Sequence, residues 1–564
     1  MIKIGEVSFV HNNIVNIKIL KTLKKEEMAK YSLTSKGDII EINGINSMLK
    51  ISSSNIMVIL KVTKQYFRDD SIFIEGYVNG FIEQGKYKFG VSFVPSINDS
   101  AYFIEEADLE IISFISRKKA KIRLGTNSLN NPTLIDLNKL LNSHNGIFGA
   151  TGQGKSYTLS NIITKSADFL IDNKLKNPIE FVVLDTNGEY SNKKFTDKYN
   201  SNIWTFTKDL FINFDENNLD FLYLIFGASE KTQKPFLNKI IINSLKYEDT
   251  NILVKELKRI NSIGHEGGFS RYKNAEFRLR TLTTILDEDE DFYKVCNEII
   301  TVIEEKITSN HFYNNAKEND IESIKIDLSS YKLNRFEYFI ILLIFNLIDS
   351  DFQRNHIEPL INRIINNFQI WEKLFSINDN SKTFDEVFIN RSKDERKLSM
   401  FVFNLSKLTI GIKRNVMKFM SQKIYNEKRK NFLIENKNIR TILYLDEVHV
   451  MDNKTDDQEL SILDEIVREG RKFKLFITYS TQMPNLISES MIAQTSNLFI
   501  HRIKNYKDYK SIEPFIKQFN INELFLFSLG VGEALVIGDV ILDYQIVLMD
   551  DPVIKPLKDD DEIF

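Results

Sequence analysis

The sequence predicts an α/β protein with a parallel sheet, preceded by a small β-barrel and interrupted by a large helical insertion. Three observations support this. Short β-branched and aromatic runs fill residues 1 to about 105, a glycine-rich loop joins a strand-like to a helix-like segment near residue 150, and helical periodicity dominates residues 205 to 430. Strand-like runs then return, and strands that alternate with helices are typical of a parallel α/β sheet.

The composition is that of a soluble globular protein. The 564 residues are 43% hydrophobic and 27% charged, and the net charge of −3 does not point to nucleic acid. The one cysteine, Cys296, cannot form a disulfide within the chain, which favours a reducing compartment. The seven histidines show no zinc spacing with cysteine, so no structural zinc is predicted.

No segment is predicted to direct the chain to a membrane. The N-terminus, "MIKIGEVSFV", lacks the apolar core of a signal peptide. The most apolar run, 338–348, is shorter than the roughly 18 residues that span a bilayer, and it predicts a buried helix. The expected location is therefore the cytoplasm, with no membrane partner.

Residues 1–105 predict the N-terminal β-barrel. Polar or glycine-containing connections separate its strand-like runs, which are rich in β-branched and aromatic residues. Several strands at such short spacing are typical of a small barrel. The runs lie at 6–19, 38–42, 55–62, 71–78 and 86–94.

Residues 106–204 predict the first part of the parallel sheet and contain the P-loop pattern G-x-x-x-x-G-K-S, from Gly149 to Ser156. The apolar "GIF" before the pattern predicts a strand, and the segment from about Tyr157 predicts a helix. This order of strand, loop and helix is the context in which a P-loop holds phosphate.

Each residue type in the loop has a chemical reason. The glycines let successive N–H groups point inward around phosphates, and the helix that follows turns its positive end toward the anion. Lys155 supplies a charge for the β- and γ-phosphates, and the Ser156 hydroxyl is a ligand for Mg²⁺. The predicted nucleotide-binding residues are Gly149, Ala150, Thr151, Gly152, Gln153, Gly154, Lys155, Ser156 and Tyr157.

The remaining chain predicts a helical insertion at 205–430 and the second part of the sheet at 431–564. In "KTQKPFLNKIIINSLKY", apolar residues recur at steps of three and four, as on a helix. After residue 431 come four strand-like runs, "RTILYLDEVHV", "KLFITYSTQ", "LFIHRI" and "EALVIGDVIL".

Two of these runs predict the second half of an ATP-hydrolysing site. The apolar strand "TILYL" ends in Asp446 and Glu447, which predicts a Walker B pair. Asp446 would hold Mg²⁺ through water, and Glu447 would polarise the attacking water. Gln482, at the end of the next strand, is predicted to contact the γ-phosphate.

Taken together and in this order, these motifs resemble those of the HerA family, hexameric DNA translocases related to the FtsK motors. "DLNKLLNSHNGIFGATGQGKS" resembles the family's lead into Walker A, and "FVVLDTNGEYS" resembles its D-x-x-G-E-Y motif, with Asp185 and Glu189 in the matching positions. Thr186 and Asn187 stand where the family often has Pro and His. "YLDEVH", "IVREGRKF", "TQMPNLIS" and "LGVGEALVIG" resemble later family segments, and the β-rich front resembles the family's HAS-barrel.

The resemblance implies a RecA-like P-loop ATPase core that binds ATP and Mg²⁺. It also implies a homo-hexamer that acts on double-stranded DNA, with each active site between two subunits. An arginine of the neighbouring subunit would then reach the γ-phosphate, and Arg471, followed by Arg468, is the candidate. Asp185 and Glu189 would support the site.

The resemblance further implies a separate effector protein, often a nuclease, in DNA end processing or anti-phage defence. The expected docking site for this effector is the N-terminal barrel, which shows no chemistry of its own. Two alternatives stay open: an ATP-dependent ring scaffold that activates an effector without translocating, and a conjugation or secretion ATPase. The acidic tail "KDDDEIF" is a further candidate contact for a partner.

Overall fold

The computed structural model describes most of the chain in two compact units. One unit comprises Met1–Asn142, Ser496–Arg502 and Ser528–Asp550, and the other comprises Ser143–Thr495, Ile503–Phe527 and Asp551–Phe564. The described residues are 3–20, 48–69, 71–104, 108, 111–112, 120–127, 132–173, 177–199, 202–214, 218–244, 265–308, 331, 333–346, 354–375, 382–389, 398–435, 439–451, 461–519, 521–541 and 544–557. The strand predicted at 38–42 and the acidic tail lie outside them.

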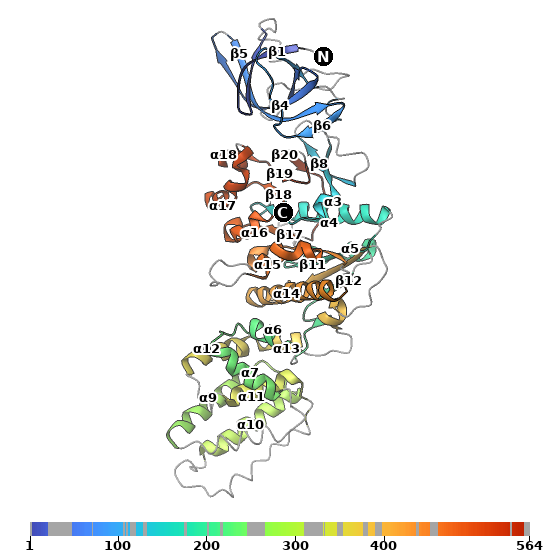
Figure 1. The fold of residues 1–564 in the computed structure, drawn as a ribbon. Coiled ribbons are helices and arrows are strands. Elements are labelled where there is room, and N and C mark those ends of the chain that lie inside the picture. Colours follow the sequence, from blue (N-terminus) through green and yellow to red (C-terminus); the bar gives the residue numbers. More distant parts are fainter. Residues whose placement is uncertain are drawn as a thin grey trace, which may run out of the picture. The chain divides into compact units, whose positions relative to one another are not determined.

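The first unit contains the predicted barrel (Figure 1). Its strands follow the order β2-β1-β7-β3-β4-β5, and β2 pairs with β5 to close the barrel, while β6 extends the β5 edge. Buried Val, Ile and Leu side chains fill the interior, as the alternating pattern of the strands requires. The prediction of a small N-terminal barrel is confirmed. The strands are β1 (Lys3–His11), β2 (Ile14–Ile19), β3 (Met48–Ser53), β4 (Ile56–Arg68), β5 (Ser71–Glu83), β6 (Lys86–Phe89) and β7 (Ser100–Phe103).

The same unit also contains a run of antiparallel strands, in the order β18-β19-β20-β8-β9. The bounds are β8 (Lys121–Asn127), β9 (Pro132–Asp136), β18 (Asn497–His501), β19 (Glu533–Gly538) and β20 (Gln545–Met549), and the short helix α3 (Leu137–Leu140) follows β9. The sequence prediction placed these strands in the two halves of the ATPase core. They group with the barrel instead, because strand pairing joins chain segments more than 350 residues apart, and local patterns cannot reveal such pairing.

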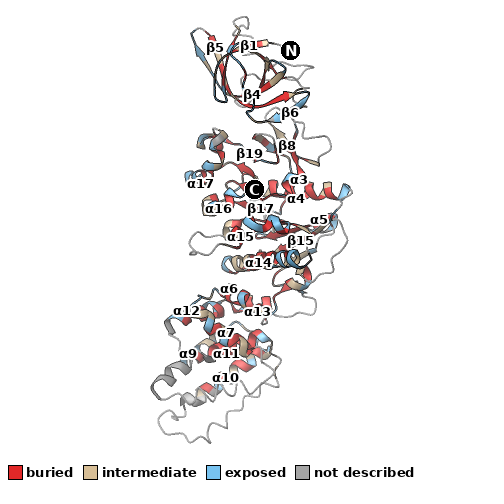
Figure 2. Ribbon diagram, viewed as in Figure 1, coloured by how far each residue is buried: buried red, intermediate tan, exposed pale blue. Residues whose placement is uncertain are grey.

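The second unit is built on a run of six parallel strands, in the order β12-β15-β11-β16-β17-β10. Its central strands are buried along their whole length, as expected when helices cover both faces (Figure 2). We call these strands and their helices the core; they form the parallel α/β fold that the sequence predicts, so the predicted fold class is confirmed. The strands are β10 (Asn145–Phe148), β11 (Ile179–Asp185), β12 (Asn202–Thr205), β15 (Leu398–Asn404), β16 (Arg440–Leu445) and β17 (Leu475–Thr481).

Helices and short helical turns lie between the strands of this sheet along the chain. They are α4 (Lys155–Asp172), α5 (Lys193–Tyr199), α14 (Ile410–Glu435), η5 (Val448–Val450), α15 (Ile462–Glu469), η6 (Gly470–Phe473), η7 (Pro484–Leu486), α16 (Glu489–Ala493), α17 (Tyr506–Ile516), η8 (Lys517–Phe519) and α18 (Glu523–Ser528). Ser461 and Ser488 cap α15 and α16 by accepting a hydrogen bond from the backbone three residues on.

The helical insertion packs around a cluster of aromatic rings. Phe226, Phe336, Phe339, Trp371 and Phe375 lie in mutual contact and are buried. The apolar run at 338–348 forms most of the buried helix α11, and no described helix is both long and apolar enough to cross a membrane. The elements are β13 (Leu210–Phe211), α6 (Leu219–Ile225), α7 (Gln233–Ser244), α9 (His265–Thr283), α10 (Asp291–Thr308), α11 (Arg335–Asn346), α12 (Arg354–Asn366), α13 (Phe368–Phe375), β14 (Lys382–Thr383) and the π-helical turn η4 (Asp385–Ile389).

The insertion is shorter than the predicted span of 205–430. Strand β15 pairs with β11 and β12 inside the parallel sheet, and helix α14 follows it, so both belong to the core. The run "LSMFVFN" was not recognised as a strand because a short apolar run reads alike in a buried strand and a buried helix.

Candidate active site

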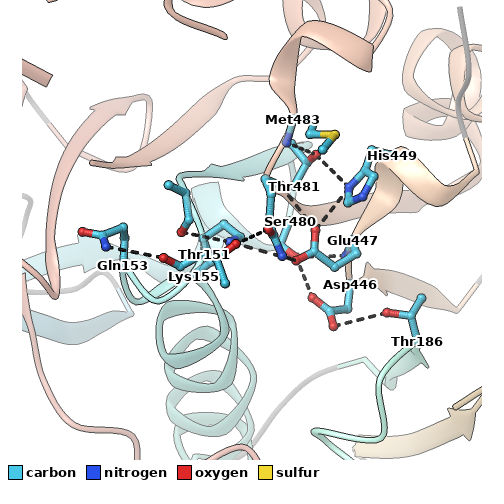
Figure 3. A network of polar contacts seen from close by, with 12 residues as sticks. Thr151, Gln153, Lys155, Thr186, Asp446, Glu447, His449, Ser480, Thr481 and Met483 are labelled. Atoms are coloured by element: carbon cyan, nitrogen blue, oxygen red, sulfur yellow. Dashed lines mark hydrogen bonds and ion pairs between the residues drawn. The ribbon is translucent and has the colours of Figure 1, made fainter. Parts of the chain in front are cut away.

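Three of the predicted catalytic residues, Lys155, Glu447 and Gln482, meet at one edge of the parallel sheet. Phe148 at the end of β10 lies opposite Thr481 at the end of β17, and Leu445 of β16 lies opposite Tyr479. Parallel strands end at the same edge, so the P-loop, the acidic pair after β16 and the polar end of β17 face one another (Figure 3). Ligands of open α/β sheets bind at this carboxyl edge.

The P-loop has the backbone shape that its glycines predict. Gly152 and Gly154 have φ of 74° and 111°, in the left-handed region, and a Cβ on Gly152 would meet only open space. Backbone conformation, and not crowding, therefore requires glycine there. Helix α4 begins at Lys155 without a side-chain cap. Its first N–H groups, including those of Ser156 and Tyr157, therefore point toward the P-loop and can donate to a bound anion.

Lys155 is held in the loop close to the acidic pair. Its Nζ lies 3.3 Å from the carbonyl oxygen of Ala150 and 4.0 Å from Oε1 of Glu447. Burial lowers the pKa of Lys155, and the charges of Glu447, Asp446 and Glu189 oppose that shift. The ammonium thus rests against carboxylates that a phosphate can replace.

Gln482 connects the P-loop to Glu447. Its Nε2 donates to Oε1 of Glu447 at 2.5 Å, and its backbone N–H donates to Oε2 at 3.3 Å. The Thr151 hydroxyl donates to the Gln482 side-chain oxygen. Sequence reasoning predicted a γ-phosphate contact for Gln482, and the structure places this amide between the loop that would hold the phosphates and the carboxylate.

Glu447 is oriented by an unusual backbone conformation. Its φ of 48° and ψ of 54° lie in the left-handed region, which costs of order 1 kcal/mol for a residue with a side chain. Burial tends to raise the pKa of Glu447, but the hydrogen bond with His449, the charge of Lys155 and the Gln482 amide together lower it. The carboxylate is therefore ionised and able to accept a proton from water.

Asp446 is buried among other acids. The Ser480 hydroxyl donates to its Oδ1 at 2.7 Å, and the Thr186 hydroxyl donates to its Oδ2 at 3.4 Å. Burial, with the charges of Glu447 and Glu189, raises the pKa of Asp446 to about 8. A carboxyl group in this position gains strongly from a nearby cation.

The residues present fit a Mg²⁺ ion bound together with nucleotide. Ser156 and Asp446 offer hard oxygen ligands, and Mg²⁺ commonly takes one or two protein ligands with phosphates and waters completing its shell.

Asp185 and Glu189 differ in what they do. Asp185 accepts hydrogen bonds from the backbone of Gly188, Glu189 and Tyr190 and from the Ser191 hydroxyl, so it shapes its own loop. Burial raises its pKa to about 6 despite these bonds. Glu189 instead adds negative charge beside Asp446 and Lys155.

The two arginines are not brought into this site. Arg468 donates to the Ser490 hydroxyl at 3.0 and 3.2 Å, and Arg471 is exposed in η6, just before β17 starts at Leu475. At about 3.3 Å per residue, strand β17 separates Arg471 from the catalytic edge by roughly 20 Å. Arg471 therefore cannot reach the phosphates of its own subunit, and a role of either arginine toward a neighbouring subunit stays a prediction.

His144, which precedes β10, makes stability depend on pH. Its Nδ1 accepts from the Ile477 backbone N–H at 3.1 Å, and burial, aided by the charge of Arg471, lowers its pKa to about 3. In the unfolded chain His144 binds a proton as the pH falls through about 6.5, whereas in the folded chain it stays neutral until about pH 3. The free energy of unfolding therefore decreases as the pH drops below 6.5. We expect this group to cost about 2 kcal/mol at pH 5 relative to pH 7. Urea unfolding of the wild type and His144→Gln at both pH values measures it, and an equal loss in both proteins would contradict this assignment.

Sequence reasoning missed several residues that orient the site. Ser480 lies just before Gln482, and His449 lies just after Glu447. Their position beside predicted site residues was the signal that could have found them. Thr186 and Tyr190 lie in the D-x-x-G-E-Y segment, where the buried Tyr190 interacts with Ser156. Lys413, which donates to the Thr186 carbonyl at 2.6 Å, comes from a helix 227 residues further along the chain and carries no motif.

Comparison with known proteins finds similarity to one family over part of the chain. Residues 122–348 match the family model described as the central domain of helicase HerA, a span that includes the P-loop and the D-x-x-G-E-Y segment. A probable DNA double-strand break repair helicase HerA of Methanocaldococcus jannaschii is 30% identical over 111 residues. A DNA double-strand break repair helicase HerA of Saccharolobus solfataricus is 32% identical over 113 residues. Each alignment covers 19% of this chain and only 22% of the relative.

Solved structures similar to this chain include VirB4 and a bacterial conjugative coupling protein. VirB4 of Thermoanaerobacter pseudethanolicus matches with a TM-score of 0.39 at 11% identity, over 76% of this chain and 96% of that protein. The unbound conjugative coupling protein TrwBdeltaN70 matches with a TM-score of 0.41 at 12% identity, over 79% of this chain and 92% of that protein.

Proposed function

We propose that the chain hydrolyses ATP to move along double-stranded DNA as a ring of six copies, and the premise is the match of residues 122–348 to the central domain of helicase HerA. The observation that carries the hydrolysis is the meeting of Lys155, Asp446 and Glu447 at one sheet edge. The relatives named as DNA double-strand break repair helicases support DNA as the substrate.

The residues divide the chemistry between binding and proton transfer. The N–H groups of the P-loop and the Lys155 ammonium hold the phosphates. Ser156 and Asp446 would hold Mg²⁺, which neutralises charge on the phosphate oxygens when bound. Glu447 accepts a proton from the attacking water, and its low pKa and fixed backbone keep that carboxylate ionised and oriented.

Gln482 gives the site a way to register the γ-phosphate. Its amide lies between the Thr151 hydroxyl of the P-loop and the Glu447 carboxylate. A phosphate held by the loop would compete for the Thr151 hydroxyl and the Gln482 amide as hydrogen-bond donors. Its binding would therefore shift the amide away from Glu447, and the Glu447 carboxylate could then accept a hydrogen bond from the attacking water.

The DNA part of the proposal is tested by the ATPase rate of the full chain. We expect linear duplex DNA to increase hydrolysis several-fold, and longer duplexes to stimulate more than short ones at equal nucleotide concentration. Glu447→Gln serves as the blank that subtracts contaminating ATPase. Hydrolysis that is indifferent to DNA of any length would overturn translocation and favour the scaffold alternative, in which ATP only holds the ring together.

We also propose that the barrel docks a separate effector protein, such as a nuclease. Exposed apolar side chains on the barrel unit support this, among them Phe9 and Phe67, which are 52% and 59% exposed. Phe9→Ser and Phe67→Ser together should weaken pull-down of the effector from the native host by at least about tenfold, as expected for loss of interface anchors. Lys64→Ser, an exposed change on the same strand as Phe67, is the matched control, and unchanged capture by the double variant would refute the docking site.

A further inference from the structure

Three consecutive residues in the first turn of α14 contact three different parts of the second unit. Lys413 Nζ donates to the Thr186 carbonyl at 2.6 Å. Arg414 Nε donates to the Val450 carbonyl at 2.9 Å. Asn415 Nδ2 donates to the Ile225 carbonyl at 3.0 Å. Successive side chains on a helix point in directions about 100° apart, so one turn can serve three neighbours at once.

Two of these contacts lead directly into the active site. Thr186, which Lys413 holds through its carbonyl, donates its hydroxyl to Asp446. Burial lowers the pKa of Lys413, and the charges of Asp185 and Asp446 oppose that shift, so this amine lies near the acids of the site. Val450, which Arg414 holds, closes the turn η5, and its N–H donates to the Glu447 carbonyl at 2.9 Å.

The third contact leads into the helical insertion. Ile225 is the last residue of α6, and the next two carbonyls, of Phe226 and Gly227, accept from Arg363 of α12 at 2.9 and 2.8 Å. Asn415 of the core and Arg363 of the insertion thus donate to carbonyls at the same end of α6, from two parts of the second unit. Helix α6 also packs on α14 through Phe221 and Phe419.

We propose that the first turn of α14, Lys413 to Asn415, transmits the nucleotide state of the active site to the helical insertion. Lys413 and Arg414 are positioning residues for the Thr186 loop and the turn after Glu447, and Asn415 is the output to α6. When phosphates and a metal ion bind, the charges around Asp446 change and the Thr186 loop and η5 rearrange. Because one rigid helical turn holds both, α14 shifts as a body and moves the capped end of α6.

This inference deepens the proposed function by naming where ATP-driven movement leaves the site, yet it depends only on nucleotide binding. The chain offers a matched set of variants. Asn415→Ala removes the output bond, Lys413→Met removes the ammonium but keeps the aliphatic stem, and Lys413→Arg keeps a charged donor. Gln422→Ala is the control, because its amide bonds to Asn426 within α14 itself.

The experiment is amide hydrogen exchange of the full-length protein, with and without Mg²⁺ and the slowly hydrolysed analogue ATPγS. In the wild type, nucleotide should change exchange in peptides covering 219–227 by about fivefold or more, the lower end of measured coupling between sites. The response should persist in Lys413→Arg and Gln422→Ala and disappear in Lys413→Met and Asn415→Ala. Exchange in the P-loop peptide should respond in all of them.

Asn415→Asp, which keeps the shape but cannot donate, replaces Asn415→Ala if the latter fails to fold. A 219–227 segment that ignores nucleotide in the wild type, or responds equally in every variant, would overturn the inference while leaving the ATPase intact. A nucleotide response at α6 without DNA-stimulated hydrolysis would support the inference and reject the motor. The two proposals therefore fail separately.

Discussion

Replacement of Glu447 by glutamine should reduce ATP turnover by about 10²–10⁴-fold, the range expected when a general base is removed. The glutamine side chain is nearly isosteric and still accepts from the Gln482 amide through its carbonyl oxygen. It cannot accept a proton from water at neutral pH. The affinity for ATP should therefore change little, because Lys155 and the P-loop backbone are untouched.

The measurement is steady-state hydrolysis together with binding of a fluorescent ATP analogue to the same preparations. Glu489→Gln, which removes an exposed carboxylate in the first turn of α16, is the matched control and should hydrolyse like the wild type. Retention of more than about a tenth of the turnover in Glu447→Gln would assign the base to another residue. Equal loss of binding and turnover would point instead to a structural role for the left-handed backbone at Glu447.

The motifs that could be predicted from sequence are those whose geometry depends on residues that are contiguous in the chain. A P-loop needs glycines at fixed positions before a helix, and the structure has Gly152 and Gly154 with positive φ directly ahead of α4. The acidic pair needs only a buried strand directly before it, and β16 ends at Leu445, one residue before Asp446. Parallel pairing then aligns the strand ends without further information.

The parts that could not be predicted depend on contacts between distant segments. Lys413 has no motif, and only the packing of α14 against the Thr186 loop gives it a place near the acids. Strand β15 looks like any short apolar run until its register with β11 is known. The arginines are the opposite case, since their segment carries a motif, but the fold bonds Arg468 to Ser490 and places Arg471 at the far edge of the sheet, before β17 begins.

Replacement of Arg471 by alanine should lower turnover by about 10³-fold or more, if this arginine stabilises the transition state from a neighbouring subunit. The structure makes the test decisive, because β17 separates Arg471 from the catalytic edge of its own chain. Any contribution of Arg471 to hydrolysis must therefore come from a second copy. Lys472→Ala, an adjacent exposed cation, is the matched control and should keep most of the activity.

Mixing Arg471→Ala with Lys155→Ala protein should restore part of the activity that both lack alone. In a mixed ring, a site with an intact P-loop on the Arg471→Ala subunit can face an intact Arg471 on the Lys155→Ala subunit, and that interface is complete. Recovery should peak near equal amounts, where such pairs are most frequent. No recovery at any ratio would reject Arg471, and the same mixture with Arg468→Ala would then decide whether the second arginine acts instead. Recovery with both would mean that each arginine contributes. We then expect the smaller contribution from Arg468, because its guanidinium already donates to the Ser490 hydroxyl.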